Sequence, residues 1–148
     1  MILRPVTAEN YDNVLDLRVS PEQERFVAPV TKSLADAFVY EGAEVRIGYE
    51  DETPVGFVLA FPFERENQPV VNIVRLLIDQ RYQQRGLGRA LLVATLHWVG
   101  TFLPRPARVR ISTKPDNEVA LSLYRNVGFV DDGMEEGETV LWLELEAP

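Results

Sequence analysis

Two glycines, Gly86 and Gly88, lie between a stretch of β-favouring apolar residues and a stretch with helical periodicity. Glycine lets the backbone approach a ligand closely. The start of a helix presents unpaired N–H groups and the positive end of its dipole. The neighbouring Arg85 and Arg89 add donors suited to phosphate oxygens. The spacing therefore predicts an anion site, and phosphate is the anion that suits it best.

Two common nucleotide-binding motifs with this appearance are both incomplete. A dinucleotide-binding fingerprint needs a third glycine where this chain has Leu91. It also needs an acid about twenty residues further on, where this chain has Arg108 and Arg110. A P-loop needs Gly-Lys-Ser or Gly-Lys-Thr, and neither follows. The sequence therefore argues against a nicotinamide enzyme and against a P-loop protein.

The glycines need a strand before them and a helix after them to form such a site. Residues 70–78 are apolar on both alternating faces except at Asn72 and Arg75, which predicts a strand covered on both sides. From Gly88 onward apolar residues recur every three or four positions, which predicts a helix. A buried arginine is costly unless paired, so Arg75 is either half of a structural ion pair, the interpretation we favour, or an acceptor-site residue.

The remaining elements predict one domain over residues 1–148. Strands are expected at residues 1–6, 44–49, 54–63 and 108–113, with a closing hairpin of 129–132 and 139–145 around a turn at 133–137. Helices are expected after a cap at Thr7, from Ser20 and Pro21, over 33–40 with Leu34, Ala37, Phe38 and Tyr40 on one face, and over 117–127 before Gly128. The fold class is α/β (α+β-like), with a mixed, mostly antiparallel central sheet flanked by helices.

Composition excludes several classes of function. The net charge of −8, from 15 basic and 23 acidic residues, argues against nonspecific nucleic-acid binding and suits equally a cationic partner or a merely soluble acidic protein. The absence of cysteine removes disulfides and thiolate chemistry, and with His97 as the one histidine no metal site is expected. No apolar run could span a membrane and no export signal is recognisable, so we expect a cytoplasmic protein without a membrane partner.

Residues 83–88, Gln-Gln-Arg-Gly-Leu-Gly, resemble the pyrophosphate-binding signature of the GCN5-related N-acetyltransferases, the GNAT family. The order of the family continues with Asn117, Tyr124 and the pair Gly128-Phe129, so the resemblance covers almost the whole chain. Within the family the chain looks most like the bacterial spermine/spermidine acetyltransferases. That likeness rests on short matches at residues 23–27, 33–35, 54–57, 75–79 and 137–138.

The resemblance implies acetyl-CoA as the donor and an amine that attacks the thioester directly. The pantothenate arm would pair with the strand at Leu76, Leu77 and Ile78, and Asn117 would bind the pantetheine. Tyr124 would be the general acid that protonates the departing thiolate, although without the family context it reads as a half-buried core tyrosine. The pyrophosphate would lie on the glycine turn, formed by Gln83, Gln84, Arg85, Gly86, Gly88 and Arg89.

The acceptor side is less defined by the sequence. The histone-acetylating branch of the family uses a glutamate on the central strand as general base, and this chain has Asn72 in that region. Glu22, Glu24 and Glu138 are candidates for the base, and transfer to bulk solvent is an equal alternative. Phe26 and Arg75 complete the residues expected near the acceptor.

These observations predict an acetyl-CoA-dependent N-acetyltransferase that modifies a primary amine of a small cationic acceptor, with polyamines as the first candidates. Two alternatives stay open: a peptide or protein N-terminal acetyltransferase, and a CoA-binding sensor without catalysis. A homodimer is expected from family likeness alone.

Overall fold

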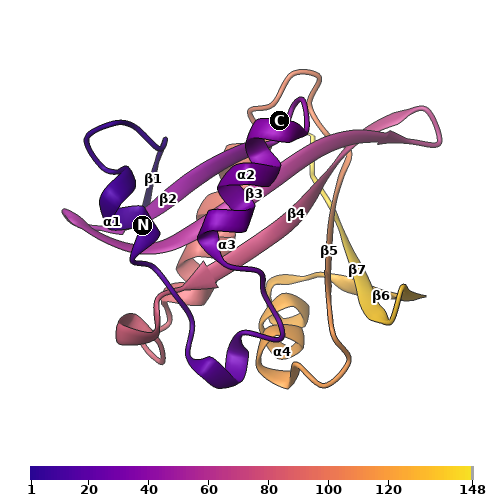
Figure 1. Cartoon of the computed structure of the whole chain (residues 1–148). Helices are drawn as coiled ribbons and strands as arrows, with labels where there is room; N and C mark the ends of the chain where they lie inside the picture. The colour runs from indigo at the N-terminus through magenta and orange to yellow at the C-terminus, as the bar shows by residue number, and fades with distance from the viewer. Residues whose placement is uncertain (148) are drawn as a thin grey trace.

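The computed structural model describes residues 1–147 and contains one seven-stranded sheet in the order β1-β2-β3-β4-β5-β7-β6. Figure 1 shows α2 in front of this sheet and α3 behind it. The strands are β1 (Ile2–Arg4), β2 (Glu44–Glu50), β3 (Thr53–Arg65), β4 (Gln68–Ile78), β5 (Arg108–Thr113), β6 (Val130–Glu135) and β7 (Glu138–Glu144). The helices are α1 (Tyr11–Leu15), α2 (Val30–Val39), α3 (Leu87–Val99) and α4 (Glu118–Val127), with short 3-10 helices η1 (Pro21–Gln23) and η2 (Gln80–Tyr82).

Strands β4 and β5 form the one parallel pair of the described sheet, and they separate before β4 ends. Their ladder joins residues 70–73 of β4 to residues 108–111 of β5, whereas β4 continues to Ile78. The pairing of β4 with β3 shifts register between Ile73 and Arg75, which leaves Val74 as a bulge where the two strands part. A bulge bends its strand and increases its twist. The sheet therefore opens between the carboxyl ends of β4 and β5.

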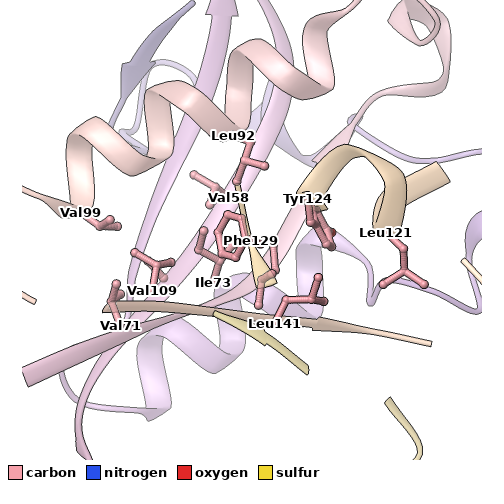
Figure 2. Packing of buried hydrophobic residues seen from close by; sticks show 12 residues of the cluster. Val58, Val71, Ile73, Leu92, Val99, Val109, Leu121, Tyr124, Phe129 and Leu141 are labelled. Carbon is pink, nitrogen blue, oxygen red and sulfur yellow. The ribbon is translucent and has the colours of Figure 1, made fainter. Parts of the chain in front are cut away.

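The central strands are buried on both faces because their alternate residues pack against different helices. Phe57 and Leu59 of β3 belong to a cluster with Val14 of α1 and Val30 of α2. Val58 and Ala60, on the opposite face, belong to a cluster that includes residues of α3 and α4. Figure 2 shows this second cluster, in which Tyr124 of α4 lies near Phe129. The mixed, mostly antiparallel sheet flanked by helices is thus confirmed.

Four local predictions were wrong. Thr7 does not cap a helix, because the Asn10 side chain accepts the Thr7 N–H (2.8 Å) and Asn10 precedes α1. Helix α2 starts at Val30, three residues before the predicted start, because Pro29 serves as its N-cap. Phe38, 91% exposed, does not join the face of α2 that packs on the sheet. The closing turn is also shorter than expected, since β6 extends to Glu135.

The predicted ends of β5 and α4 agree closely with the structure. Strand β5 has the expected bounds, and Asn117 is the N-cap of α4. Gly128 follows α4 with φ +123°, a region that favours glycine. Over residues 1–147 no helix is long and apolar enough to cross a membrane.

Candidate active site

A cleft of about 450 Å³ occupies the opening between the carboxyl ends of β4 and β5. One wall is the end of β4, another is the loop that leads into α3, and a third is the inner face of α4. We call this the donor cleft, after the donor site that the sequence predicts for its residues. The predicted donor-site residues that line it are Leu76, Leu77, Ile78, Gln83, Gln84, Gly86, Gly88, Arg89, Asn117 and Tyr124.

The glycine turn presents open space in front of the start of α3. Gly86 is the N-cap of α3 with φ +76°, and Gln84 also has a positive φ of 64°. A Cβ atom built on Gly86 would meet nothing within 4 Å, and one on Gly88 would meet only Leu123 Cδ2, at 3.5 Å. The first N–H groups of a helix lack acceptors within the helix. The turn can therefore receive a phosphate group at close range.

The side chain of Gln83 anchors the loop before α3. Its amide forms a reciprocal pair with the Gln23 amide (2.9 and 3.1 Å) and donates to the Ile78 carbonyl (2.9 Å). The pair joins the glycine loop to η1, sixty residues earlier. Gln83 lines the donor cleft, but its side chain holds the loop in place rather than standing free for a ligand.

Asp79 fixes the end of β4 next to this loop. Its side chain is 1% exposed. It accepts hydrogen bonds from the N–H of Arg18 (3.0 Å), the N–H of Arg81 (2.9 Å) and Nε of Arg81 (2.7 Å). Burial alone raises the pKa of Asp79, but the hydrogen bonds from Arg81 and Arg18 outweigh burial and hold that pKa below its usual value. Asp79 is therefore an ionised anchor for the segments on both sides of the donor cleft.

The lowered pKa of Asp79 makes a prediction for stability. The carboxylate stabilises the fold above the pKa of an unfolded aspartate, about 3.9, and this contribution is lost as the pH falls through the lower folded pKa. Asp79→Asn should cost about 1–3 kcal/mol at pH 7. The difference in the free energy of unfolding between Asp79→Asn and the native protein, measured by urea unfolding, should shrink below about pH 4. Asp132→Asn, at an exposed position of β6, is the control, and a gap that stays constant down to pH 3 would contradict the role.

Asn117 links β5 to the start of α4. Its amide nitrogen donates to Thr113 Oγ1 (2.9 Å), and its amide oxygen accepts from the Ala120 N–H (3.4 Å). An amide group has two N–H donors, so one remains for a ligand in the cleft. Asn117 lines the donor cleft.

Tyr124 lies at the inner end of the donor cleft. The residue is 7% exposed, and its ring lies 6.1 Å from that of Phe129 (Figure 2). Burial, together with the negative charge of Glu138, raises the pKa of Tyr124 to about 12. The phenol therefore carries its proton throughout the neutral range and can act as a proton donor.

A second cleft of about 460 Å³ adjoins the first, and we call it the acceptor cleft because residues predicted for the acceptor side, such as Phe26 and Arg75, line it. Phe26, Ile73 and Ser112 line both clefts, so the two meet where β4 and β5 separate. Two carboxylates, Glu24 and Glu138, and two arginines, Arg25 and Arg75, also line the acceptor cleft.

Both arginines of the acceptor cleft have carboxylate partners. Arg25 pairs with Asp116 at 2.7 Å, and Arg75 pairs with Asp36 at 3.2 Å. The second pair agrees with the structural role that we favoured for Arg75. In the described residues Arg75 Nε is the one buried side-chain nitrogen or oxygen without a hydrogen-bond partner. Glu24 and Glu138 therefore provide most of the uncompensated charge in the acceptor cleft.

Two residues predicted for the site lie outside both clefts. Glu22 is exposed on η1, where its own N–H and the Ser20 side chain lower its pKa. Arg85 is exposed and lies 3.8 Å from Glu50.

Ser112, in contrast, was not predicted, although it lines both clefts and its hydroxyl donates to Glu138 at 2.8 Å. Its only sequence signal is a polar residue in the alternating pattern of residues 108–113, which an ordinary solvent-facing strand also has.

Comparison with known proteins identifies the family. The sequence model of the acetyltransferase (GNAT) family matches residues 11–129. This protein belongs to the GNAT family. The spermine/spermidine N(1)-acetyltransferase of Bacillus subtilis (strain 168) is 32% identical over 150 aligned residues, which cover 97% of each chain. The predicted family and its N-acetyltransferase class are confirmed.

Solved structures of other GNAT proteins share the fold. A spermidine N-acetyltransferase from Vibrio cholerae, in complex with CoA and spermine, aligns with a TM-score of 0.75 at 15% identity, covering 97% of this chain and 94% of that one. A GNAT family acetyltransferase from Elizabethkingia anophelis with acetyl-CoA bound aligns with a TM-score of 0.68 at 19% identity, covering 97% of both chains. At these identities the likeness extends to the fold.

Proposed function

We propose that this GNAT protein transfers the acetyl group of acetyl-CoA to a primary amine of a small cationic acceptor, with polyamines as the first candidates. The observation that carries the proposal is the meeting of two clefts where β4 and β5 part. One cleft holds a glycine turn and a protonated tyrosine, and the other holds two carboxylates.

The donor cleft suits acetyl-CoA by its shape and its donors. The N–H groups after Gly86 would receive the pyrophosphate, and Arg89 would add a positive charge beside it. Residues 76–78 of β4 have no β5 partner, so their backbone groups are available to pair with an extended arm. Bound acetyl-CoA would supply an activated thioester carbonyl, and the chain's own residues would orient it toward the acceptor cleft.

The acceptor cleft favours a cation. Arg25 and Arg75 are neutralised by their partners, whereas Glu24 and Glu138 have no cationic partner within residues 1–147. An ammonium group would therefore be attracted to the cleft, and a carboxylate ligand would be repelled. The name of the Bacillus subtilis relative, at 32% identity, supports polyamines as the first acceptors to test.

The residues present suit direct attack by the amine. The chain contains no cysteine, so no acyl-cysteine can carry the acetyl group between the substrates. Tyr124 would hold its proton until the C–S bond breaks and then donate it to the sulfur. Phe26, which lines both clefts, would exclude water from the space between the substrates.

The proposal is tested by thiol release from acetyl-CoA with a panel of amines. We expect turnover with spermidine or spermine, and a higher KM at high salt because the attraction of the carboxylates is screened. The panel includes aminoglycosides, amino acids and peptide N-termini. A preference for peptides over diamines would point to N-terminal acetylation instead. Binding of acetyl-CoA without turnover of any amine would point to a CoA sensor.

A further inference from the structure

Glu138 and Ser112 form a hydrogen-bonded pair at the junction of the two clefts. Ser112 lies on β5 and Glu138 is the first residue of β7, the strand next to it in the sheet. The Ser112 hydroxyl donates to Glu138 Oε1 at 2.8 Å. Ser112 lines both clefts and Glu138 lines the acceptor cleft. The pair therefore lies where the two clefts meet, which is where the proposed reaction would place the attacking nitrogen.

Glu138 differs from the other carboxylates considered for the amine. Glu22 is exposed on η1 and lines neither cleft. Glu24 is exposed directly after η1 and lines the acceptor cleft alone. Glu138 is half-buried, and its charge contributes to the raised pKa of Tyr124. Of the three, it alone also bonds to a residue that lines both clefts, Ser112.

We propose that Glu138, positioned by Ser112, accepts the proton of the attacking nitrogen. The inference rests on the proposed acetyl transfer and assigns a base to it. One oxygen of the carboxylate is held by the Ser112 hydroxyl, so the other is free to face the amine. A carboxylate that is held in one orientation before reaction loses little entropy when it accepts a proton.

The proton transfers balance with these two residues and a water molecule between them. The neutral amine forms the C–N bond at the thioester carbon, which makes its nitrogen acidic, and Glu138 takes one proton from that nitrogen. The C–S bond then breaks with its electron pair on sulfur, and Tyr124 gives its phenolic proton to that sulfur. The carboxyl group of Glu138 returns its proton to the phenolate through water. The products are the amide and the free thiol, and both residues end in their starting states.

The charged groups around Glu138 leave it free for this task. From other elements, Arg25 and Arg75 share its cleft, and each is paired with an aspartate. Arg110, two residues before Ser112 on β5, is paired with Glu135 at 2.7 Å. Glu24 lies on the same cleft and is a like charge. The acid–base partners left for Glu138 are therefore the substrate nitrogen and Tyr124.

Chemical rescue tests the proposal. Glu138→Ala should lower kcat with spermidine about 100-fold, the usual range for loss of a general base, and added formate should restore at least about a tenfold gain. Formate supplies a small carboxylate in the space that alanine leaves. Glu138→Gln, which fills that space with a neutral amide, should lose a similar factor and should not respond to formate.

Glu24→Ala is the matched control, because it removes a carboxylate from the same cleft. We expect it to raise KM for the amine, with no response to formate. Unimpaired kcat in Glu138→Gln, absence of formate rescue in Glu138→Ala, or equal rescue of Glu24→Ala would each overturn the inference. Should Glu138→Ala fail to fold, Glu138→Gln and Ser112→Ala decide, since normal kcat in both would equally overturn it. Absence of thiol release by the native protein with every amine of the panel would instead count against the proposed function.

Discussion

Tyr124→Phe should lower kcat about 100- to 1,000-fold with the preferred amine, while the Kd for acetyl-CoA changes by less than about twofold. The substitution removes only the phenolic oxygen. The departing thiolate would then take its proton from water, which the closely packed end of the cleft limits. The ring itself and its contact with Phe129 are kept.

The raised pKa of Tyr124 determines how the loss of kcat in Tyr124→Phe should depend on pH. With a pKa of about 12, the phenol stays protonated over the whole range in which the enzyme can be assayed. The native rate should rise with pH as the ammonium form of the acceptor loses its proton, and no fall that is due to Tyr124 should follow below about pH 10. The deficit of Tyr124→Phe should therefore persist across the profile.

The measurement combines steady-state kinetics with calorimetric titration of acetyl-CoA. Tyr40→Phe, at an exposed position that lines neither cleft, is the matched control and should be neutral in both assays. The melting temperature of Tyr124→Phe should stay close to that of the native protein, because the packing volume is almost unchanged. Undiminished turnover in Tyr124→Phe would refute the assignment of the general acid.

The central part of the fold could be predicted because its signals are local. A stretch that is apolar on both faces except at Asn72 and Arg75 marks the strand at residues 70–78, and a period of three to four marks the helix after Gly88. The start of the first helix was misplaced because Thr7 and Asn10 can each accept a hydrogen bond from a backbone N–H group near the other. Asn10 binds the N–H of Thr7, and a sequence cannot show which of these residues folds back on the other.

The candidate site was predictable to the extent that it is local in sequence. The glycine turn is contiguous, so its chemistry could be read from residue types. The Gln23–Gln83 pair and the Ser112–Glu138 pair join residues that lie 60 and 26 positions apart, and no local pattern marks such pairs. Glu22 and Glu24 are only two positions apart and both are exposed, yet Glu22 lies outside both clefts and Glu24, after the end of η1, lines the acceptor cleft.

Gly86→Val should lower the affinity for acetyl-CoA about 100-fold or more. The unoccupied space next to Gly86 is the space that a bound phosphate needs, and a branched side chain would fill it. Loss of two charge-assisted N–H contacts, each worth about 1.5–3 kcal/mol, accounts for a factor of this size. Calorimetric titration with acetyl-CoA and with CoA measures it.

A valine at this position also strains the backbone, because Gly86 has φ +76°. That strain costs about 1–3 kcal/mol and would lower stability whether or not the turn binds a phosphate. Gly133→Val separates the two effects. Gly133 has φ +81°, its Cβ would also meet nothing within 4 Å, and it lies on β6 outside both clefts. Gly133→Val should lose comparable stability and keep the native affinity for acetyl-CoA. Equal losses of affinity in the two variants, or retained affinity in Gly86→Val, would exclude the glycine turn as the pyrophosphate site.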